Sequence, residues 1–456
     1  MTQHLHPAIL REYDIRGVVG PMLGPPDAHA VGRSFATRVR RVAGTRVAVG
    51  RDGRLSSPEL EAALVEGLRA GGVDVVRIGV GPTPMLYFAE ATLGVDGGVQ
   101  VTGSHNPPGH NGFKLMLGHR SFFGDDVQDL AHLAAAGDWS EGAGTVEEVD
   151  IQDAYVSRLL DAHPVAARVG WDTGNGAAGP VIEALCRRLP GEHHLLHIAV
   201  DGRFPNHHPD PSEEGNLADL KTLVLSKGLD CGFAFDGDGD RIGAVDGRGR
   251  AVRADLLLAL LAEPVLRDLP GATIIADVKS SAALFDRVRD LGGRPLMWKS
   301  GHSSIKSRML GEKAPIAGEL SGHIFFAHRW YGFDDAQYAA VRLLELLGET
   351  GRTLADLVDA LPRYHATPEL RFPVDPARRL AVVDEVLARL EARGATVDRV
   401  DGARVTTADG WWLLRASNTE ALLTVRAEAK GQPALARLLA EVDAELAGSG
   451  VRRPPD

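Results

Sequence analysis

The stretch RVAVGRDGRLSSPELEAALVEGLRAGGVDVVRIG, residues 46–79, decides the fold. Its Val-rich start predicts a strand that ends near Asp52. Ser57 is placed to cap a helix that has Pro58 at its first position, and a Gly-Gly pair at 71–72 ends this helix. A second Val-rich strand follows. This order favours two parallel strands joined by a right-handed crossover.

The same pattern occurs twice more along the chain. RVGWDTGNGAAGPVIEALCRRLPG, residues 168–191, runs on into HHLLHIAV, and ATIIADVKSSAALFDRVRDLGGRPLMWKSG spans residues 272–301. In each copy a strand ends in Asp, a turn of small residues opens a helix, and Gly precedes the next strand. We therefore expect three similar α/β domains with mixed, mainly parallel sheets, whose sites lie at the carboxyl ends of the strands.

The last part of the chain has a different pattern. An amphipathic helix is expected from about Asp375, followed by short strands at 403–407, 411–415 and 421–428 and by a C-terminal helix. This order predicts a smaller α+β domain. We expect four domains around a central cleft, at residues 1–149, 150–250, 251–361 and 362–456.

Composition excludes several classes of protein. The chain has 456 residues, 44% of them hydrophobic, and a formal net charge of −11. This negative charge does not favour binding to nucleic acid or to an anionic membrane. Only Cys186 and Cys231 are present, which argues for a reducing compartment. No signal peptide or membrane-length apolar stretch is evident, so we expect a cytoplasmic location.

The motif FAFDGDGDRIGAV, residues 233–245, carries the strongest chemical signal. Asp236, Asp238 and Asp240 alternate with Gly after an apolar strand. Three carboxylates this close repel one another unless a cation neutralises them, and oxygen ligands favour Mg²⁺. An EF-hand is excluded because its sixth position is Arg241 and its twelfth is Gly247. A solvated acidic turn is the alternative.

The motif VTGSHNPPGHNGFKLM, residues 101–116, places Ser104 between Gly103 and His105 after a strand-like segment. A serine at a strand end is compatible with a nucleophile or a phosphoryl carrier. It is equally compatible with an ordinary turn, since Ser, Asn, Pro and Gly all favour turns. Lys114 lies close enough in the sequence to neutralise a phosphate.

Two further motifs are less specific. In GELSGH, Glu319, Ser321 and His323 alternate, so an extended chain would point all three to one side. A carboxylate and a hydroxyl suit sugar hydroxyls, and the imidazole suits acid–base chemistry, but a half-exposed strand edge fits as well. In RASNTEALLTVR, residues 415–426, a small polar loop follows Arg415 and suits an anion, or is a plain hairpin loop.

Two other patterns have competing interpretations. Gly174, Gly176 and Gly179 fit the spacing of a dinucleotide-binding turn. The matching turns of the other two repeats lack these glycines, so we interpret them as part of the repeated turn. His207 and His208 could bind metal, but neighbours point to different sides of an extended chain, which favours a connecting loop.

The motifs TGSHNP, DGDGDR, GELSGH and RASNTE follow in this order, one for each expected domain. Together they resemble the motifs of the α-D-phosphohexomutase superfamily over nearly the whole chain. Residues 318–347, GELSGHIFFAHRWYGFDDAQYAAVRLLELL, are most similar to the bacterial phosphomannomutase/phosphoglucomutase branch. The phosphoglucosamine mutase branch usually carries Gln where Leu320 stands.

The resemblance implies a role for each motif. Ser104 would carry the phosphoryl group, and one Mg²⁺ would be held by Asp236, Asp238, Asp240 and the phosphoserine. Arg241, Lys114 and His323 would act on the transferred group, with Lys114 and His323 as acid–base candidates. The substrate-binding positions implied by the resemblance are Tyr13, Arg16, His105, Lys279, His302, Glu319, Ser321, Arg415, Ser417, Asn418 and Thr419.

The resemblance also implies a reaction. A hexose 1-phosphate and a hexose 6-phosphate, of mannose or glucose, would be interconverted through a hexose 1,6-bisphosphate that turns over in the site. The alternatives are a phosphoglucosamine mutase and a metal-dependent sugar phosphatase, although a hydrolase has no need of the second phosphate site in RASNTE. The expected ligands are the hexose phosphate substrates, and no obligatory protein partner is evident.

Overall fold

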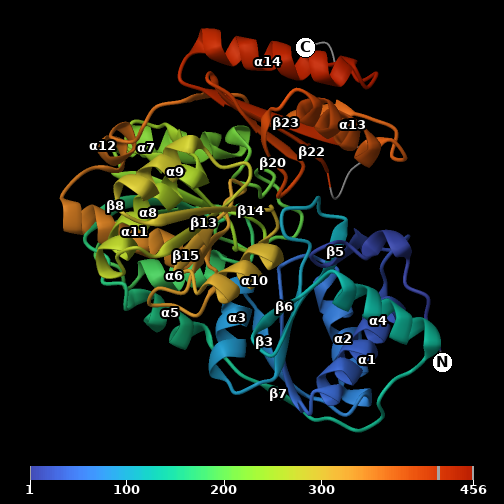
Figure 1. The fold of residues 1–456 in the computed structure, drawn as a ribbon. Helices are drawn as coiled ribbons and strands as arrows, with labels where there is room; N and C mark the ends of the chain where they lie inside the picture. The colour runs from blue at the N-terminus through green and yellow to red at the C-terminus, as the bar shows by residue number, and fades with distance from the viewer. Residues whose placement is uncertain (1, 418–421, 454–456) are drawn as a thin grey trace.

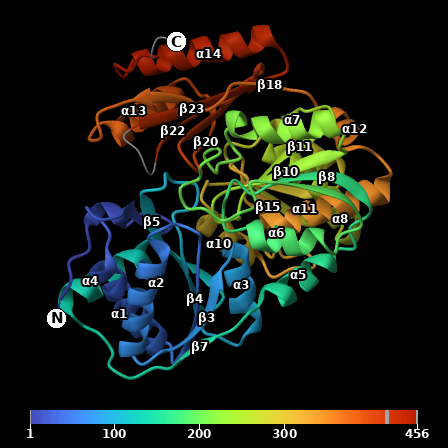
Figure 2. The same ribbon diagram turned by 180° about the vertical axis from the view of Figure 1, so that it is seen from behind.

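The structure is a computed structural model that describes residues 2–417 and 422–453. Its strands form four separate sheets, and these define the four domains. Figures 1 and 2 show the fourth domain above the other three, with the first domain below it and the second and third packed side by side. This confirms the fold class expected from the sequence.

The first domain is built on a seven-stranded sheet in the order β1-β5-β4-β2-β3-β7, with β6 paired to β5. Strands β2, β3, β4 and β7 are parallel to one another, and β1, β5 and β6 complete an antiparallel edge. Its elements are η1 (Pro7–Ile9), β1 (Ile15–Val18), α1 (Pro25–Arg41), β2 (Arg46–Arg51), α2 (Ser57–Ala70), β3 (Asp74–Val80), α3 (Thr83–Thr92), β4 (Gly97–Val101), β5 (His110–Leu117), β6 (Arg120–Phe122), α4 (Asp125–Ala136) and β7 (Val146–Glu148).

The second domain has a five-stranded sheet in the order β12-β11-β10-β8-β9. Strand β8 is parallel to β9 and β10, whereas β11 is antiparallel to β10 and β12. Its elements are α5 (Gln152–Leu160), β8 (Ala167–Asp172), α6 (Gly179–Cys186), β9 (Gly191–Leu196), η2 (Glu214–Leu217), α7 (Ala218–Lys227), β10 (Cys231–Phe235), β11 (Ile242–Asp246) and β12 (Ala251–Val252).

The third domain repeats this design in the order β14-β13-β15-β16-β17. Strand β13 is parallel to β14 and β15, and β16 is antiparallel to its neighbours. Its elements are α8 (Ala254–Asp268), β13 (Thr273–Asp277), α9 (Ala282–Asp290), β14 (Arg294–Trp298), α10 (His302–Glu312), β15 (Ile316–Gly318), β16 (Ile324–Phe326), β17 (Phe333–Asp334), α11 (Ala336–Thr350) and α12 (Leu354–Asp359).

The fourth domain has an antiparallel sheet in the order β18-β23-β22-β21-β20, with β19 also paired to β23. Helix α13 begins four residues later than expected, because Asp375 first forms a turn in which its carbonyl accepts the Arg378 N–H. The elements are β18 (His365–Ala366), β19 (Leu370–Pro373), α13 (Arg379–Ala392), β20 (Thr396–Asp398), β21 (Ala403–Thr406), β22 (Gly410–Ala416), β23 (Leu422–Ala429) and α14 (Gln432–Ala447).

The three repeated units form as the sequence predicts. The strand pairs β2–β3, β8–β9 and β13–β14 are parallel, and each is joined by one helix. One detail differs. Ser57 is the first residue of α2 rather than its cap, and its hydroxyl donates to Asp52 Oδ1 at 2.5 Å. The Ser57 hydroxyl therefore binds the buried carboxylate of Asp52, directly after β2, instead of capping the helix.

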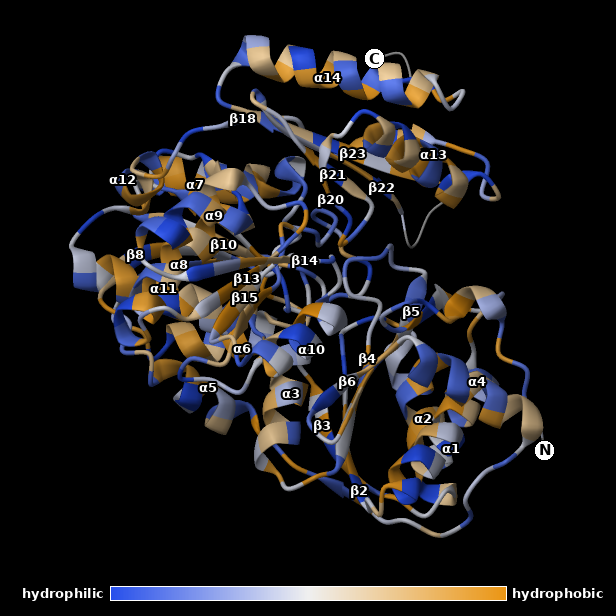
Figure 3. Cartoon of the chain, in the orientation of Figure 1, coloured by the Kyte–Doolittle hydropathy of each residue, from blue (hydrophilic) through white to orange (hydrophobic). Residues whose placement is uncertain are grey.

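Hydrophobic residues are concentrated in the central strands and recur in bands along the helices (Figure 3). One buried cluster is continuous through the first three domains and includes Tyr87, Trp171, Phe233 and Tyr338. The fourth domain has a core of its own. A small cluster around Val278, Trp411 and Leu413 joins it to the third domain. Among the described residues, no helix is long and apolar enough to cross a membrane, and both cysteines are free.

Candidate active site

Ser104 lies in the loop that follows β4. Its backbone adopts a left-handed conformation with φ of +48°, which is uncommon for a residue with a side chain. The Ser104 N–H donates to Thr102 Oγ1 at 2.8 Å, and the Ser104 hydroxyl donates to Asp236 Oδ2 at 2.9 Å. The side chain is buried. The loop thus turns the serine oxygen from the first domain toward the acidic turn of the second.

Arg54 fixes the shape of the serine loop, although it was not among the predicted site residues. Its buried guanidinium donates to the carbonyl oxygens of Ser104 and Asn106, both at 2.6 Å, and to those of Pro107 and His110. It also pairs with Asp52, whose carboxylate accepts from the Thr102 hydroxyl. An arginine two residues after a strand-ending aspartate was the available signal. The serine loop is therefore cross-linked to the end of β2.

Asp236, Asp238 and Asp240 occupy the turn between β10 and β11. The turn closes through a hydrogen bond from the Gly239 N–H to the Asp236 carbonyl, and Gly239 takes a φ of +69°. Asp236 Oδ1 accepts the N–H groups of Asp240 and Arg241 at 3.0 and 3.1 Å. One oxygen from each of the three carboxylates lies within 4.8 Å of the others, and all three residues are fully buried. The turn gathers the carboxylates at one point.

Two other domains hold this acidic turn. The Thr83 hydroxyl of the first domain donates to Asp238 Oδ2 at 2.6 Å, and the Thr83 N–H donates to the Asp238 carbonyl at 2.8 Å. Gln337 of the third domain donates through Nε2 to the Gly239 carbonyl at 2.8 Å. Gln337 lies in the 318–347 stretch that resembles the family, but neither Gln337 nor Thr83 was among the predicted site residues. The position of the carboxylates therefore depends on the packing of three domains.

Lys114 supplies positive charge inside the acidic cluster. Its Nζ lies 2.7 Å from Asp238 Oδ2 and also contacts Asp240 Oδ2. Burial alone would lower the pKa of Lys114, but the carboxylates of Asp238 and Asp240 outweigh it and raise this pKa. Burial and the charges of Asp238 and Asp240 raise the pKa of Asp236 well above its ordinary value. The single positive charge of Lys114 does not balance three carboxylates, so the ionised cluster carries excess negative charge.

The acidic turn has the features of a metal site. The Oδ1 atoms of Asp238 and Asp240 are buried and accept no hydrogen bond from any residue that the structure describes. Buried carboxylate oxygens without a partner are costly unless a cation binds them. With oxygen as the only ligand type, the three carboxylates fit a hard divalent cation.

His323 and Arg241 lie beside the acidic turn. The Arg241 Nε–H donates to His323 Nε2 at 3.0 Å. The other ring nitrogen of His323, Nδ1, lies 2.8 Å from Asp334 Oδ2 and 3.6 Å from Asp240 Oδ1. The ring of His302 stacks on His323 with centroids 5.4 Å apart. Because Nε2 accepts from Arg241, the proton of a neutral His323 ring is on Nδ1, which faces Asp334. Asp334 was not among the predicted site residues.

Glu319 and Ser321 differ from expectation in their local structure. Residues 319–323 form a turn between β15 and β16, in which the Gly322 N–H donates to the Glu319 carbonyl at 3.1 Å. The expected extended stretch is wrong, because Gly322 takes a φ of +108° and reverses the chain. Ser321 Oγ lies 3.4 Å from Glu319 Oε2, and Glu319 accepts the Gly301 N–H. The two side chains still lie together.

The N-terminal residues approach the same region. The Tyr13 hydroxyl donates to the Ser300 carbonyl at 2.7 Å, and its ring meets that of His302 edge-on at 6.0 Å. Arg16 donates to Asn106 Oδ1 at 2.7 Å in the serine loop. His105 Nδ1 lies 3.2 Å from Ser104 Oγ. All three predicted positions thus contact either the serine loop or the segment before α10.

The remaining predicted residues lie between the third and fourth domains. Lys279 Nζ is 3.7 Å from Glu369 Oε2, and Arg415 pairs with Asp401 Oδ2 at 3.0 Å. Asp401 Oδ2 also accepts the Ser300 N–H at 3.1 Å, which links Arg415 to the segment before His302. The Ser417 carbonyl accepts from Arg379 at 2.5 Å. Asn418 and Thr419 lie outside the described residues.

Four domains, with a buried serine of the first facing three carboxylates of the second, define the class of α-D-phosphohexomutases. Comparison with known families agrees. The profiles described as phosphoglucomutase/phosphomannomutase alpha/beta/alpha domains I, II and III match residues 8–137, 153–249 and 253–364, and the C-terminal domain profile matches residues 369–445. The chain belongs to the phosphoglucomutase/phosphomannomutase family.

Similar proteins cover nearly the whole chain. A phosphomannomutase/phosphoglucomutase of Pseudomonas putida is 43% identical over 95% of this chain and 96% of its own length. A phosphoglucomutase of Neisseria gonorrhoeae is 42% identical over 94% and 95%. The crystal structure of a phosphoglucomutase/phosphomannomutase family protein from Burkholderia thailandensis, 42% identical, superposes with a TM-score of 0.92 over 98% of this chain and 99% of its own.

Proposed function

We propose that this chain interconverts the 1- and 6-phosphates of mannose or glucose through a phosphoserine at Ser104 and a hexose 1,6-bisphosphate. The observation that supports this most is the Ser104 hydroxyl, which lies 2.9 Å from Asp236 within an acidic cluster that fits a divalent cation. Phosphoryl transfer depends on in-line positioning and charge neutralisation, and the site provides groups for both.

Mg²⁺ is the proposed ion, held by Asp236, Asp238 and Asp240 together with an oxygen of the phosphorylated Ser104. When bound, it supplies the positive charge that neutralises the transferred phosphoryl group. Lys114 serves as a fixed positive charge rather than a proton donor, because two carboxylates hold its ammonium group. Arg241 supplies a second positive charge.

His323 is the proposed base. Its Nδ1 faces Asp334, so this nitrogen holds the proton and Nε2 carries the lone pair, as the hydrogen bond from Arg241 requires. When Arg241 turns to the substrate phosphate, Nε2 can take the proton of the attacking sugar hydroxyl. The phosphoryl group passes to that hydroxyl, its bond to the Ser104 oxygen breaks, and the released oxygen takes up a proton from water.

The bisphosphate must then turn over, so that its other phosphate faces Ser104 and returns to the serine. Glu319 and Ser321 would grip two sugar hydroxyls in both orientations. Arg415, Ser417, Asn418 and Thr419 would bind the phosphate that is not being transferred. Tyr13, Arg16, His105, Lys279 and His302 would line the substrate. The working domain limits in this proposal are 149/150, 250/251 and 361/362, and the location is cytoplasmic.

An isomerase assay tests the proposal. The purified protein is given Mg²⁺, a trace of glucose 1,6-bisphosphate, and mannose, glucose or glucosamine 1-phosphate in parallel. We expect the 6-phosphates of mannose or glucose to form. Turnover of glucosamine phosphate alone would favour the phosphoglucosamine mutase alternative. Release of free phosphate without isomerisation would point to a phosphatase and overturn the proposal.

A further inference from the structure

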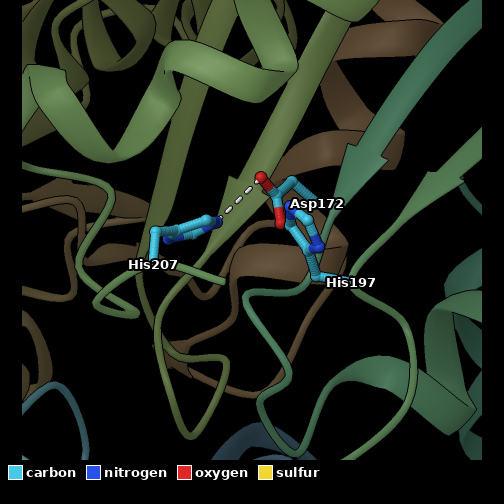
Figure 4. A group of neighbouring side chains, drawn as sticks. All are labelled: Asp172, His197 and His207. Atoms are coloured by element: carbon cyan, nitrogen blue, oxygen red, sulfur yellow. Dashed lines mark hydrogen bonds and ion pairs between the residues drawn. The ribbon is translucent and has the colours of Figure 1, made fainter. Parts of the chain in front are cut away.

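Two histidines and an aspartate gather in the second domain at a place that the proposed reaction does not use. Asp172 ends β8, His197 follows β9, and His207 lies in the loop before η2. One ligand atom of each lies within 4.8 Å of the other two. Figure 4 shows both imidazole rings beside the Asp172 carboxylate, with His207 Nε2 at 3.0 Å from Asp172 Oδ2.

The hydrogen bonds of His207 leave a lone pair facing a carboxylate. Its Nδ1 lies 2.9 Å from the His208 carbonyl oxygen, which can only accept, so Nδ1 carries the proton. In the neutral ring, Nε2 then has no proton to give to Asp172. The pair therefore requires either a positively charged ring or a cation bound between Nε2 and the carboxylate.

His197 is held in the same manner. Its Nε2 lies 3.1 Å from Asp219 Oδ2, so Nε2 donates and Nδ1 keeps the lone pair. A histidine that binds a metal almost always gives its other ring N–H to a carboxylate or a backbone carbonyl. Both histidines of this cluster satisfy that condition through groups outside the cluster.

The backbone around the cluster is rigid. Asp172 is fully buried, and its Oδ1 accepts the Gly174 N–H at 2.9 Å. His197 has a φ of +50°, and its carbonyl accepts from the Asn175 N–H and the Thr173 hydroxyl, both at 2.8 Å. The two histidine side chains are each only 15% exposed. The donors are therefore placed by the fold before any ion binds.

We propose that Asp172, His197 and His207 form a second metal site, which binds a transition-metal ion of the Zn²⁺ type and is distinct from the oxygen-only site of the acidic turn. Two imidazoles and one carboxylate suit Zn²⁺ or Co²⁺ and not Mg²⁺. A water molecule would occupy the fourth position.

The site has a structural role in this proposal. It clamps the loop at residues 198–210, in which Phe204 lies 5.1 Å beneath the Arg54 guanidinium of the first domain. A Cβ on Gly53 would come within 2.0 Å of the Val200 side chain, so the two domains fit closely here. The bound ion would thus stiffen the contact between this loop and the residues that hold Ser104.

A Co²⁺ titration tests the proposal, because Co²⁺ replaces Zn²⁺ and absorbs visible light when bound by imidazole. The whole protein is first stripped with a chelator and then titrated with Co²⁺ in excess Mg²⁺, which occupies the acidic turn. We expect one equivalent of Co²⁺ to bind and to be displaced by Zn²⁺. Absence of any bound Co²⁺ would overturn the proposal and leave a charged His207 paired with Asp172.

Three variants make the test specific. His197→Asn removes one ligand with a residue that tolerates positive φ, and should weaken Co²⁺ binding by at least about 100-fold. Asp219→Ala removes only the outer partner of His197 and should weaken Co²⁺ binding by about 10- to 100-fold. His194→Asn, on β9 but outside the cluster, is the control and should bind like the parent. Equal affinity in His197→Asn and the parent would overturn the proposal.

Discussion

Ser104 combines a left-handed backbone with a hydroxyl aimed at Asp236, so its position is specified by the loop rather than by its own preference. Ser104→Ala removes only the oxygen. We expect activity to fall by roughly 10³-fold or more, with the folded state retained. Isomerase activity and the intact mass after incubation with bisphosphate measure this change. Ser226→Ala, on the exposed surface of α7, is the control, and near-normal turnover by Ser104→Ala would refute the phosphoserine.

Asp238 contributes one of the two carboxylate oxygens of the acidic turn that lack a hydrogen-bond partner among the described residues. Asp238→Asn keeps the shape but removes an anionic ligand. We expect the Mg²⁺ concentration for half-maximal activity to rise by about tenfold or more. Activity measured across a Mg²⁺ titration gives this value, with Asp230→Asn as the control in the same domain. An unchanged titration curve would contradict the assignment of the metal site.

The loss of Arg54 should lower the stability of the protein strongly. It donates to four carbonyl oxygens and pairs with the buried Asp52. Arg54→Met would leave that carboxylate without its charge partner. We expect the free energy of unfolding to fall by about 3–5 kcal/mol, as when a buried pair loses one member. Urea unfolding measures the change. A decrease in the free energy of unfolding below about 1 kcal/mol would show that the serine loop keeps its shape without Arg54.

At the level of elements, the three strand–helix–strand units could be predicted because their periodicity and their Gly and Pro positions are local signals. The glycines of the 174–179 turn have a steric explanation. A Cβ on Gly176 would come within 3.0 Å of the Asp236 carbonyl, and one on Gly179 within 2.1 Å of the Ile198 carbonyl. These close approaches explain the glycines without a dinucleotide.

Contacts between elements far apart in sequence could not be predicted in the same way. Thr83 and Gln337 were not predicted as site residues, and only the packing of the first and third domains against the second brings them to the acidic turn. Asp334 was not predicted either, and the pairing of β16 with β17 places it beside His323. The shape of residues 319–323 was also missed, because alternation suggested an extended chain while one glycine reverses it. Motifs therefore identified the groups with chemistry, and the fold supplied the groups that position them.

Helix α11 begins at a carboxylate with an unusual titration. Burial raises the pKa of Asp335 to about 7, although hydrogen bonds from the Tyr338 N–H and the Tyr155 hydroxyl oppose the shift. In the unfolded chain the carboxyl group of Asp335 has its ordinary pKa of about 3.9. The folded state thus holds this proton more tightly, so its contribution to stability is full below that value and is lost as pH rises through about 7.

Asp335→Asn should remove this loss, because the amide carries no charge at any pH. As the pH rises from about 5 to 7, we expect the free energy of unfolding of the variant to increase relative to that of the parent, by at most roughly 1.4 kcal/mol per pH unit. Urea unfolding at several pH values measures the difference. Asp384→Asn, exposed on α13, is the control. A difference that does not change with pH would contradict the prediction.

At the scale of the whole molecule, one buried cluster runs through the first three domains, and the fourth domain has a core of its own. The first domain has a further cluster against α1, α2 and α4, but the shared cluster ties this domain to the second and third. We expect calorimetry to resolve two unfolding transitions. Val386→Ala should lower only the transition of the fourth domain, and Phe233→Leu only that of the other three, because each deletes buried surface in one core. A single transition that both variants shift equally would contradict this division.

The hydrogen bond from Gln337 to the acidic turn also has a consequence for biosynthesis. Its partners are 98 residues apart in the chain. At ordinary rates of translation, Gln337 is added roughly 5 to 20 seconds after Gly239, while the domains already made begin to fold. A nascent chain therefore holds all three metal-binding carboxylates before it has the residue that fixes their turn. Ribosome-bound fragments that stop short of Gln337 are expected to contain the acidic cluster without its final support, so activity arises late in synthesis.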